Sequence, residues 1–336
     1  MGKLKGAGWA MAGLLLAATG AGAVEVRNTP LEITGFMDVL FSADNPAPGT
    51  RNFRLGQAEL DIAACLADHT CTCVALAYDP EAGTFGLGCA TIEFLLAGNG
   101  SDCRHHYEKW ERSGVLVGQF DVPFGIDWLA YPSVDRRTIT APDAIAATHD
   151  SWNDIGAMAF IEARRYTVRA WVVNGSDTEV ANGEELLLVE NDGAIGARAS
   201  VMPAEGLELG ASIAAYNTCD DAQATSLLGA DAQFARGPWS LKGEYVARDV
   251  EPGDGRTLTD AGWYGQATRA FDGWWLFGRY DRLDLETEAA PDPEYLGLGL
   301  GLNVSAPAEL RFEYRAWMGD DGAGDDTWLA QLVTGF

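Results

Sequence analysis

Residues 294–318 read EYLGLGLGLNVSAPAELRFEYRAWM, two adjacent runs that alternate with a period of two. In the first, leucines alternate with glycine or asparagine. In the second, apolar residues alternate with Glu309, Arg311, Glu313 and Arg315. Alternation of this kind indicates β-strands, because successive side chains point to opposite faces. A soluble sandwich would bury the leucines in a core. A membrane barrel would place them in lipid and the charges in a water-filled lumen.

Energetics favour the barrel. Arg311 and Arg315 would each cost about 2–4 kcal/mol facing lipid near the bilayer midplane, and little in an aqueous lumen. The same alternation recurs in 193–202, 206–216 and 238–248. After the N-terminal region no segment has the 18 or more consecutive apolar residues of a membrane helix. A chain of this kind crosses a bilayer only as a closed barrel, because open sheet edges are not tolerated in hydrocarbon.

Turn signals at short, regular spacing predict an all-β unit without a linker. The connections alternate between short ones such as 203–205 and long ones such as 123–153 and 175–192. Short periplasmic turns and long outer loops give this rhythm, and aromatic residues near the strand ends suit an interfacial girdle. We therefore predict a 16-stranded antiparallel transmembrane β-barrel, with strands at 31–42, 52–65, 71–79, 84–96, 114–122, 154–163, 165–174, 193–202, 206–216, 224–236, 238–248, 260–270, 272–282, 294–304, 307–318 and 326–336.

The first 23 residues have the pattern of an export signal. Lys3 and Lys5 precede an apolar stretch, and Ala21-Gly22-Ala23 is a small-residue cleavage site. A transmembrane anchor is the alternative, but the stretch is short for one. We expect a signal peptide at 1–23 and a barrel domain at 24–336, reaching a Gram-negative outer membrane or a secreted pool after Sec-type export.

The formal net charge is −26. Such a chain repels nucleic acid, so we expect no DNA or RNA partner. The acidic excess is concentrated in expected loops, for example at Asp320, Asp321, Asp325 and Asp326. A solvated loop face explains it, and a divalent-cation bridge to lipopolysaccharide is the alternative.

The C-terminal strand ends in Leu332-Val333-Thr334-Gly335-Phe336, and a terminal Phe resembles the assembly signal of Gram-negative outer-membrane barrels. GQFDVPFG at 118–125, WNDIG at 152–156 and VNG at 173–175 resemble the phosphate-selective (O/P-type) porin family. The resemblance implies a trimeric barrel that passes small hydrophilic solutes by diffusion, sits in lipid and lipopolysaccharide, and is recognised by the barrel-assembly machinery through Phe336. Phosphate-selective members use many lysines, whereas this chain has only Lys109 and Lys242 beyond the signal, so an anion preference does not carry over.

The segment 123–153 is too long for a simple hairpin, and long loops of this kind are usually functional or disordered. In porins the third outer loop folds inward and narrows the channel. We expect the same here, with constriction residues Asp127, Asp135, Arg136, Arg137 and Asp143. A loop lying over the mouth of the barrel is the alternative.

Alternation also predicts which charged side chains face the lumen. The basic ones are Arg169, Arg198, Lys242, Arg248, Arg279, Arg311 and Arg315, and the acidic ones are Glu59, Asp61, Asp121, Glu162, Glu208, Asp231, Glu244, Asp281, Glu309 and Glu313. Rings of charged side chains set pore selectivity. The mixed, slightly acidic balance predicts weak cation preference or little selectivity, with a local anion track along the arginines as the alternative.

Six cysteines are unusual for a barrel. The predicted topology gathers Cys65, Cys71, Cys73 and Cys103 at the periplasmic rim. Structural disulfides suit that oxidising compartment, and the pair we favour is Cys71 with Cys103. A Cys/His metal site that includes His69, His105 and His106 is the alternative.

No catalytic motif stands out, so we expect no enzyme and no cofactor. The leading function is a passive diffusion channel. The alternatives are a barrel that houses a periplasmic electron-transfer partner, motivated by the cysteine-rich rim, and a soluble acidic β-sandwich that binds carbohydrate.

Overall fold

The computed structural model describes residues 24–26, 29–42, 53–80, 83–98, 111–149, 152–175, 179–182, 185–188, 191–218, 223–251, 255–287, 292–319 and 325–336. Its strands are β1 Val24–Val26, β2 Thr29–Ser42, β3 Phe53–Ala67, β4 Thr70–Asp79, β5 Thr84–Ala97, β6 Arg112–Asp121, β7 Asn153–Ala163, β8 Tyr166–Val173, β9 Glu179–Asn182, β10 Glu185–Leu188, β11 Asn191–Ala204, β12 Leu207–Thr218, β13 Gln223–Arg236, β14 Trp239–Glu251, β15 Leu258–Phe271, β16 Trp274–Asp284, β17 Glu294–Ser305, β18 Ala308–Trp317 and β19 Thr327–Gly335. A 3₁₀ helix, η1 (Asp127–Ala130), and an α-helix, α1 (Asp143–Thr148), lie between β6 and β7.

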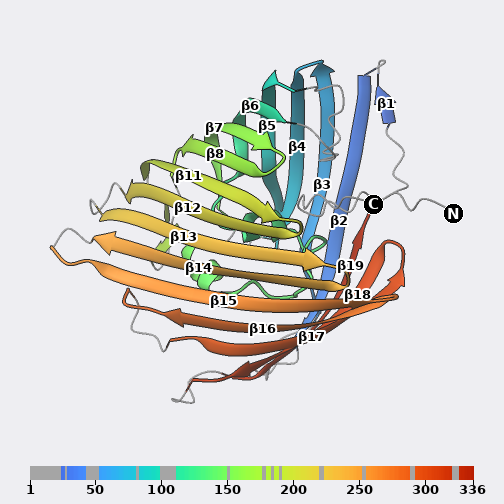
Figure 1. The fold of residues 1–336 in the computed structure, drawn as a ribbon, viewed down its shortest axis with the longest axis vertical. Coiled ribbons are helices and arrows are strands. Elements are labelled where there is room, and N and C mark those ends of the chain that lie inside the picture. Colours follow the sequence, from blue (N-terminus) through green and yellow to red (C-terminus); the bar gives the residue numbers. More distant parts are fainter. Residues whose placement is uncertain are drawn as a thin grey trace.

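Sixteen strands, β2–β8 and β11–β19, pair antiparallel with their neighbours in sequence (Figure 1). Two pairings join strands that do not follow each other directly in the chain. β11 pairs with β8, past the intervening β9 and β10, and β19 pairs with β2 at the other end of the sheet. The second pairing closes the sheet into a barrel, so no strand edge is left open to lipid. The predicted 16-stranded antiparallel barrel is confirmed. The short β1 adds to the start of β2, and β9 and β10 form a separate hairpin.

The two faces of the sheet differ in polarity in the way the alternation predicted. On β18, Arg311 and Glu313 are 2% and 1% exposed, whereas Phe312 between them is 43% exposed. On the neighbouring β17, Leu298 is 51% exposed. Apolar side chains therefore cover the outside, where lipid would solvate them, and charged side chains are enclosed.

The glycines of the 294–304 run serve close packing. Trp275 and Phe277 of β16 are opposite Gly301 and Gly299 of β17 in register. A Cβ atom on Gly301 would lie 2.0 Å from the Trp275 ring, and one on Gly299 would lie 2.0 Å from the Phe277 ring. The lack of a side chain at Gly299 and Gly301 therefore leaves room for two buried aromatic rings to pack against the backbone of β17.

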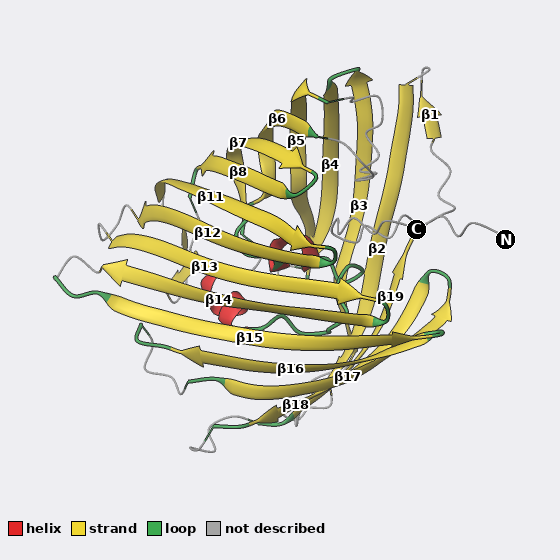
Figure 2. Cartoon of the chain, viewed as in Figure 1, coloured by secondary structure: helices red, strands yellow, loops and turns green. Residues whose placement is uncertain are grey.

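The chain between β6 and β7 fills part of the space inside the curve of the strands, and Figure 2 shows both short helices there. Helix α1 contacts β14, β15 and β16. Among the described residues, no helix is long and apolar enough to cross a membrane.

Candidate pore constriction

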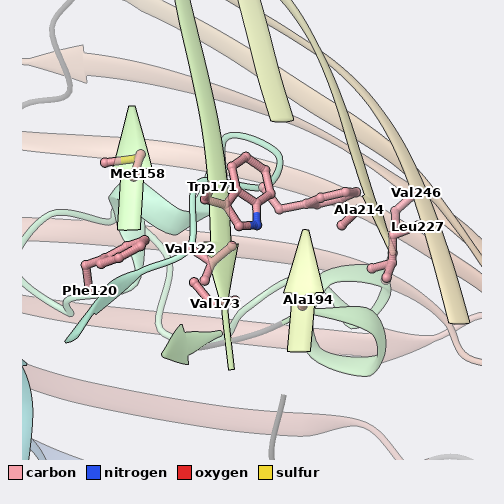
Figure 3. Packing of buried hydrophobic residues seen from close by; sticks show 11 residues of the cluster. Phe120, Val122, Met158, Trp171, Val173, Ala194, Ala214, Leu227 and Val246 are labelled. Atoms are coloured by element: carbon pink, nitrogen blue, oxygen red, sulfur yellow. The ribbon is translucent and has the colours of Figure 1, made fainter. Parts of the chain in front are cut away.

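Residues 122–149, called the loop segment below, begin at an apolar cluster on the enclosed face of the sheet. Val122 and Phe124 are 2% and 0% exposed and pack with Trp171 of β8, Leu227 of β13 and Val246 of β14 (Figure 3). Fully burying one large apolar side chain stabilises by about 1.5–3 kcal/mol. The start of the segment is therefore held to the barrel wall by burial of apolar surface.

Backbone groups continue this attachment. The Gly125 amide donates to Ser212 Oγ at 3.0 Å, and the Ile126 amide donates to Glu244 Oε2 at 3.0 Å. Gly125 has a φ of +64°, and a Cβ atom there would lie 1.7 Å from Glu244 Oε1. A glycine is required at this position, both for its backbone conformation and for the close approach of the carboxylate.

Asp127, predicted as a constriction residue, is engaged in an ion pair with Lys242. Tyr264 donates a second hydrogen bond to its carboxylate. Burial alone would raise the pKa of Asp127, but the Lys242 charge and the hydrogen bonds from Lys242 and Tyr264 outweigh it, so the pKa lies below its ordinary value. Asp127 is therefore a charged anchor between the segment and β14.

The middle of the segment is attached to β18 and β16 through Glu313 and Arg279. Glu313 Oε2 accepts from the amides of Ile139 at 2.6 Å and Thr140 at 3.1 Å. Arg279 donates to the Thr140 carbonyl at 2.8 Å and to the Ala141 carbonyl at 3.3 Å. One acidic and one basic side chain thus satisfy consecutive peptide groups that would otherwise be buried without partners.

Further contacts complete the attachment. Arg311 donates to the Ser133 carbonyl at 2.6 Å, and the Ser133 amide donates to Gln57 at 2.7 Å. Asp143, another predicted constriction residue, pairs with Arg315 at 2.6 Å. The segment therefore touches enclosed side chains on β3, β12, β14, β15, β16 and β18.

The other predicted constriction residues lie between these anchors. The Arg137 guanidinium lies 4.3 Å from the centroid of Trp275, and burial lowers its pKa. Burial and the nearby charge of Asp61 raise the pKa of Asp135 to about 7, although Arg311 opposes the shift. Arg136 is partly buried. Asp135 therefore changes charge near neutral pH.

His149 is the last residue of the loop segment and was not among the predicted site residues. Its Nε2 lies 3.6 Å from Glu244 Oε1, and its ring packs edge-on against Phe124 at 4.7 Å between centroids. Burial lowers the pKa of His149 to about 4, with Asp127 opposing the shift, so the ring is neutral at physiological pH. Glu244 therefore lies between the two ends of the loop segment.

The enclosed wall also carries ion pairs between strands. Arg112 of β6 pairs with Glu93 at 3.1 Å and with Glu162 at 2.5 Å, and Glu162 also pairs with Arg169 at 2.6 Å. These residues form an alternating series across β5, β6, β7 and β8. Neither Arg112 nor Glu93 was among the predicted lumen-facing residues. Arg112 lies two residues before the predicted strand 114–122, whereas Glu93 lies within the predicted strand 84–96.

Most enclosed basic residues are engaged in this way, as further pairs show. Arg198 pairs with Asp231, Arg248 with Asp260, Arg279 with Asp281, and Arg311 with Glu309. Glu208 lies 3.9 Å from Arg198. In contrast, the carboxylates that form no ion pair with any described residue include Glu59, Asp61, Asp121 and Asp135. The acidic side chains of this wall are therefore less completely paired than the basic ones.

The described cysteines lie on β3, β4 and β5: Cys65, Cys71, Cys73 and Cys89. Cys65 is disulfide-bonded, and its Sγ lies 3.0 Å from Sγ of Cys71, which is opposite it in register. Cys103 and Cys219 lie outside the described residues, so the pairing of Cys71 with Cys103 stays a prediction. His105 and His106 of the alternative metal site lie outside them too. Within the described ranges, no group of three or more His, Cys, Asp or Glu side chains could hold a metal ion.

A closed 16-stranded antiparallel barrel with an apolar outside, an enclosed charged wall and a long segment fixed against that wall has the fold of an outer-membrane β-barrel. The structural comparisons agree. An OmpT loop-deletion mutant, an outer membrane protein of Vibrio cholerae, superposes with a TM-score of 0.65 at 11% identity, covering 92% of this chain and 99% of that one. Another structure of the same protein is described as a trimer form.

Two further structures have the same fold. The anion-selective porin from Comamonas acidovorans has a TM-score of 0.62 at 14% identity, covering 92% of this chain and all of that one. The outer membrane channel DcaP of Acinetobacter baumannii has a TM-score of 0.62 at 12% identity, covering 94% of this chain and 99% of that one. At these identities the likeness shows the fold alone.

Sequence comparison adds a partial match. Residues 149–278 match the β-barrel domain of S-layer protein SlpA, and this matched range is less than half of the chain. No curated protein matches the chain. The structural neighbours are outer-membrane porins and channels, and they do not single out the phosphate-selective family that the sequence resembles.

Proposed function

We propose that this protein is a passive diffusion porin for small hydrophilic solutes or ions across a Gram-negative outer membrane. The observation that carries the proposal is the polarity of the closed barrel: Arg279, Arg311 and Glu313 are enclosed, whereas Leu298 and Phe312 face outward. A barrel of 16 or more strands is wide enough for an aqueous channel. A water-filled lumen accounts for the enclosed charged side chains, and lipid acyl chains outside the barrel account for the exposed apolar ones.

The loop segment is the inward-folded third outer loop of this channel. Its contacts with enclosed side chains of β14, β16 and β18 support this placement. The constriction it forms contains Asp135, Arg136 and Arg137, with Asp127 and Asp143 as charged anchors. A folded partner housed in the same lumen would have to displace these contacts, so the channel is preferred over a barrel that houses an electron-transfer protein.

The channel prefers cations weakly. Basic side chains of the wall are largely neutralised by ion pairs, while Glu59, Asp61, Asp121 and Asp135 have none among the described residues. Negative groups at a narrow, enclosed site raise the local concentration of cations. The mixed charges elsewhere keep the preference small.

Cell context follows from the same proposal. Residues 1–23 act as the export signal, and 24–336 form the barrel, in lipid and lipopolysaccharide. Phe336 is exposed, and its amide and carbonyl hydrogen-bond to Gly35 of β2. The terminal residue thus lies where β19 meets β2, accessible to the assembly machinery.

The trimer form of a structural neighbour supports a homotrimer. Enzymatic activity is not expected.

Planar-bilayer recording of the refolded protein under a potassium chloride gradient tests the proposal. We expect discrete conductance steps and a reversal potential of the sign that indicates cation preference. A refolded barrel that inserts but conducts no ions would overturn the channel function. A reversal potential of the opposite sign would overturn the selectivity alone.

A further inference from the structure

Two exposed arginines lie on the outside of the barrel, at the end where short turns join the strands. Arg236 is the last residue of β13, and Arg269 lies near the end of β15. Strands β13, β14 and β15 lie side by side (Figure 1), and Trp239 of β14 is opposite both arginines in register. Residues opposite each other in register share a face of the sheet, so the three side chains form one row.

The neighbours of this row show that it belongs to the lipid face. Trp239 is 46% exposed, and Leu241, two residues further along β14, is 43% exposed. Side chains two residues apart on a strand lie on the same face. Leu276 of β16, which is opposite Arg269 in register, is also 43% exposed. The row therefore borders the apolar outer surface and does not face the lumen.

Aromatic rings place the row at the edge of the membrane. The Arg269 guanidinium lies 5.1 Å from the centroid of Trp239 and 4.8 Å from the centroid of Phe271. Phe271 in turn stacks on Trp274, across the turn between β15 and β16, with 4.0 Å between centroids. Aromatic residues at the ends of membrane strands lie at the level of the lipid headgroups. Arg269 is therefore held at headgroup depth, where a lipid-facing arginine costs little.

Neither arginine is neutralised by the protein. Arg236 and Arg269 form no ion pair with any described residue, and the exposed Asp272 in the adjacent turn forms none with them. Most enclosed basic side chains, in contrast, are paired. In a chain with a formal net charge of −26, two neighbouring positive charges are therefore left for an external anion.

A lipid phosphate matches this arrangement. Neighbouring strands lie about 4.8 Å apart, so the Cα atoms of Arg236 and Arg269 are separated by about 10 Å, close enough for both side chains to converge on one group. Guanidinium groups bind phosphate through paired, charge-assisted hydrogen bonds. Anionic lipids attract basic side chains at the membrane surface. A zwitterionic lipid is less suited, because its own cation competes with the arginines for the phosphate.

We propose that Arg236, Trp239 and Arg269 form a binding site for the phosphate group of an anionic phospholipid in the periplasmic leaflet. Both arginines contact the phosphate, and Trp239 holds the Arg269 guanidinium at the depth of the headgroup. The inference rests on the proposed outer-membrane location and goes beyond the passage of solutes.

The test is native mass spectrometry of the detergent-folded barrel with dioleoylphosphatidylglycerol, which measures the dissociation constant of the first bound lipid. Dioleoylphosphatidylcholine has the same acyl chains and phosphate but carries a cation, and we expect it to bind about fivefold more weakly. Arg236→Gln and Arg269→Gln should each raise the dissociation constant for phosphatidylglycerol about tenfold, the loss of one charge-assisted hydrogen bond. Arg269→Lys keeps the charge but loses the paired donors, so it should have a smaller effect.

A double variant, Arg164→Gln with Arg165→Gln, is the matched control. It removes two exposed arginines from the turn between β7 and β8, at the same end of the barrel. Neither guanidinium lies over a described aromatic ring. The control should leave the dissociation constant unchanged. Heat-dependent migration on gels verifies that each variant forms a folded barrel.

The results separate a lipid site from general attraction. Equal weakening by the control pair would overturn the site, because diffuse charge at this end of the barrel would then explain the binding. Equal affinity for the two lipids would overturn the preference for an anionic headgroup. Unchanged binding in both Arg236→Gln and Arg269→Gln would overturn the assignment of these residues. No ionic current enters the measurement, so failure of the lipid site and failure of the channel function are distinguishable.

Discussion

Replacing Glu313 with glutamine should loosen the middle of the loop segment. The Glu313 carboxylate accepts from the Ile139 amide, the Thr140 amide and the Thr140 hydroxyl, and it lies 3.6 Å from Arg279. Hydrogen bonds to charged groups contribute about 1.5–3 kcal/mol each. Glutamine keeps the shape and one acceptor oxygen but loses the charge. We therefore expect the free energy that attaches the loop segment to the wall to weaken by about 2–4 kcal/mol. The ratio of detached to attached segment then rises at least about 30-fold.

Single-channel recording at high salt measures this effect. A segment that detaches intermittently should raise the open-channel current noise and the mean conductance. Glu208→Gln is the matched control, because it removes the same charge from β12 and makes no described contact with the loop segment. Native noise and conductance in Glu313→Gln, with the barrel folded, would refute the assignment of Glu313 as an anchor.

Three further outcomes are expected. Gly301→Ala should destabilise the barrel by about 1–3 kcal/mol in urea unfolding, because its Cβ would lie 2.0 Å from Trp275, whereas Gly265→Ala, with no atom within 4 Å, should change little. Cation preference should fall as the pH is lowered from 8.5 to 5.5, because Asp135, with a pKa of about 7, loses its negative charge; unchanged reversal potentials would contradict this. Leu298→Arg, on the lipid face, should reduce the free energy of folding into phosphatidylcholine vesicles by about 2–4 kcal/mol, and a smaller loss would argue against a midplane position.

The sixteen barrel strands were predictable because each follows a local rule. The predicted runs 294–304 and 238–248 correspond to Glu294–Ser305 and Trp239–Glu251. Alternate side chains along a strand lie on the same face, whichever strands it pairs with. Side-chain polarity then decides which face is wet, and Arg311 and Phe312 lie on opposite faces as expected.

The interior of the barrel was less predictable, because it depends on contacts across more than a hundred residues. Asp127 was predicted to line a constriction, but its ion pair with Lys242 depends on the conformation of the loop segment and has no local signature. The roles of His149 and Tyr264 have no local signature. Nor did the long connections reveal α1 or the hairpin of β9 and β10.

Most anchors of the loop segment act on its peptide groups, not on its side chains. Arg311 holds the Ser133 carbonyl, Arg248 the Ala147 carbonyl, and Glu313 the Ile139 amide. Every amino acid other than proline supplies the same peptide groups. A side chain of the segment such as Asp135 could therefore be replaced to retune the proposed channel for nanopore sensing, while these peptide-group contacts stay in place.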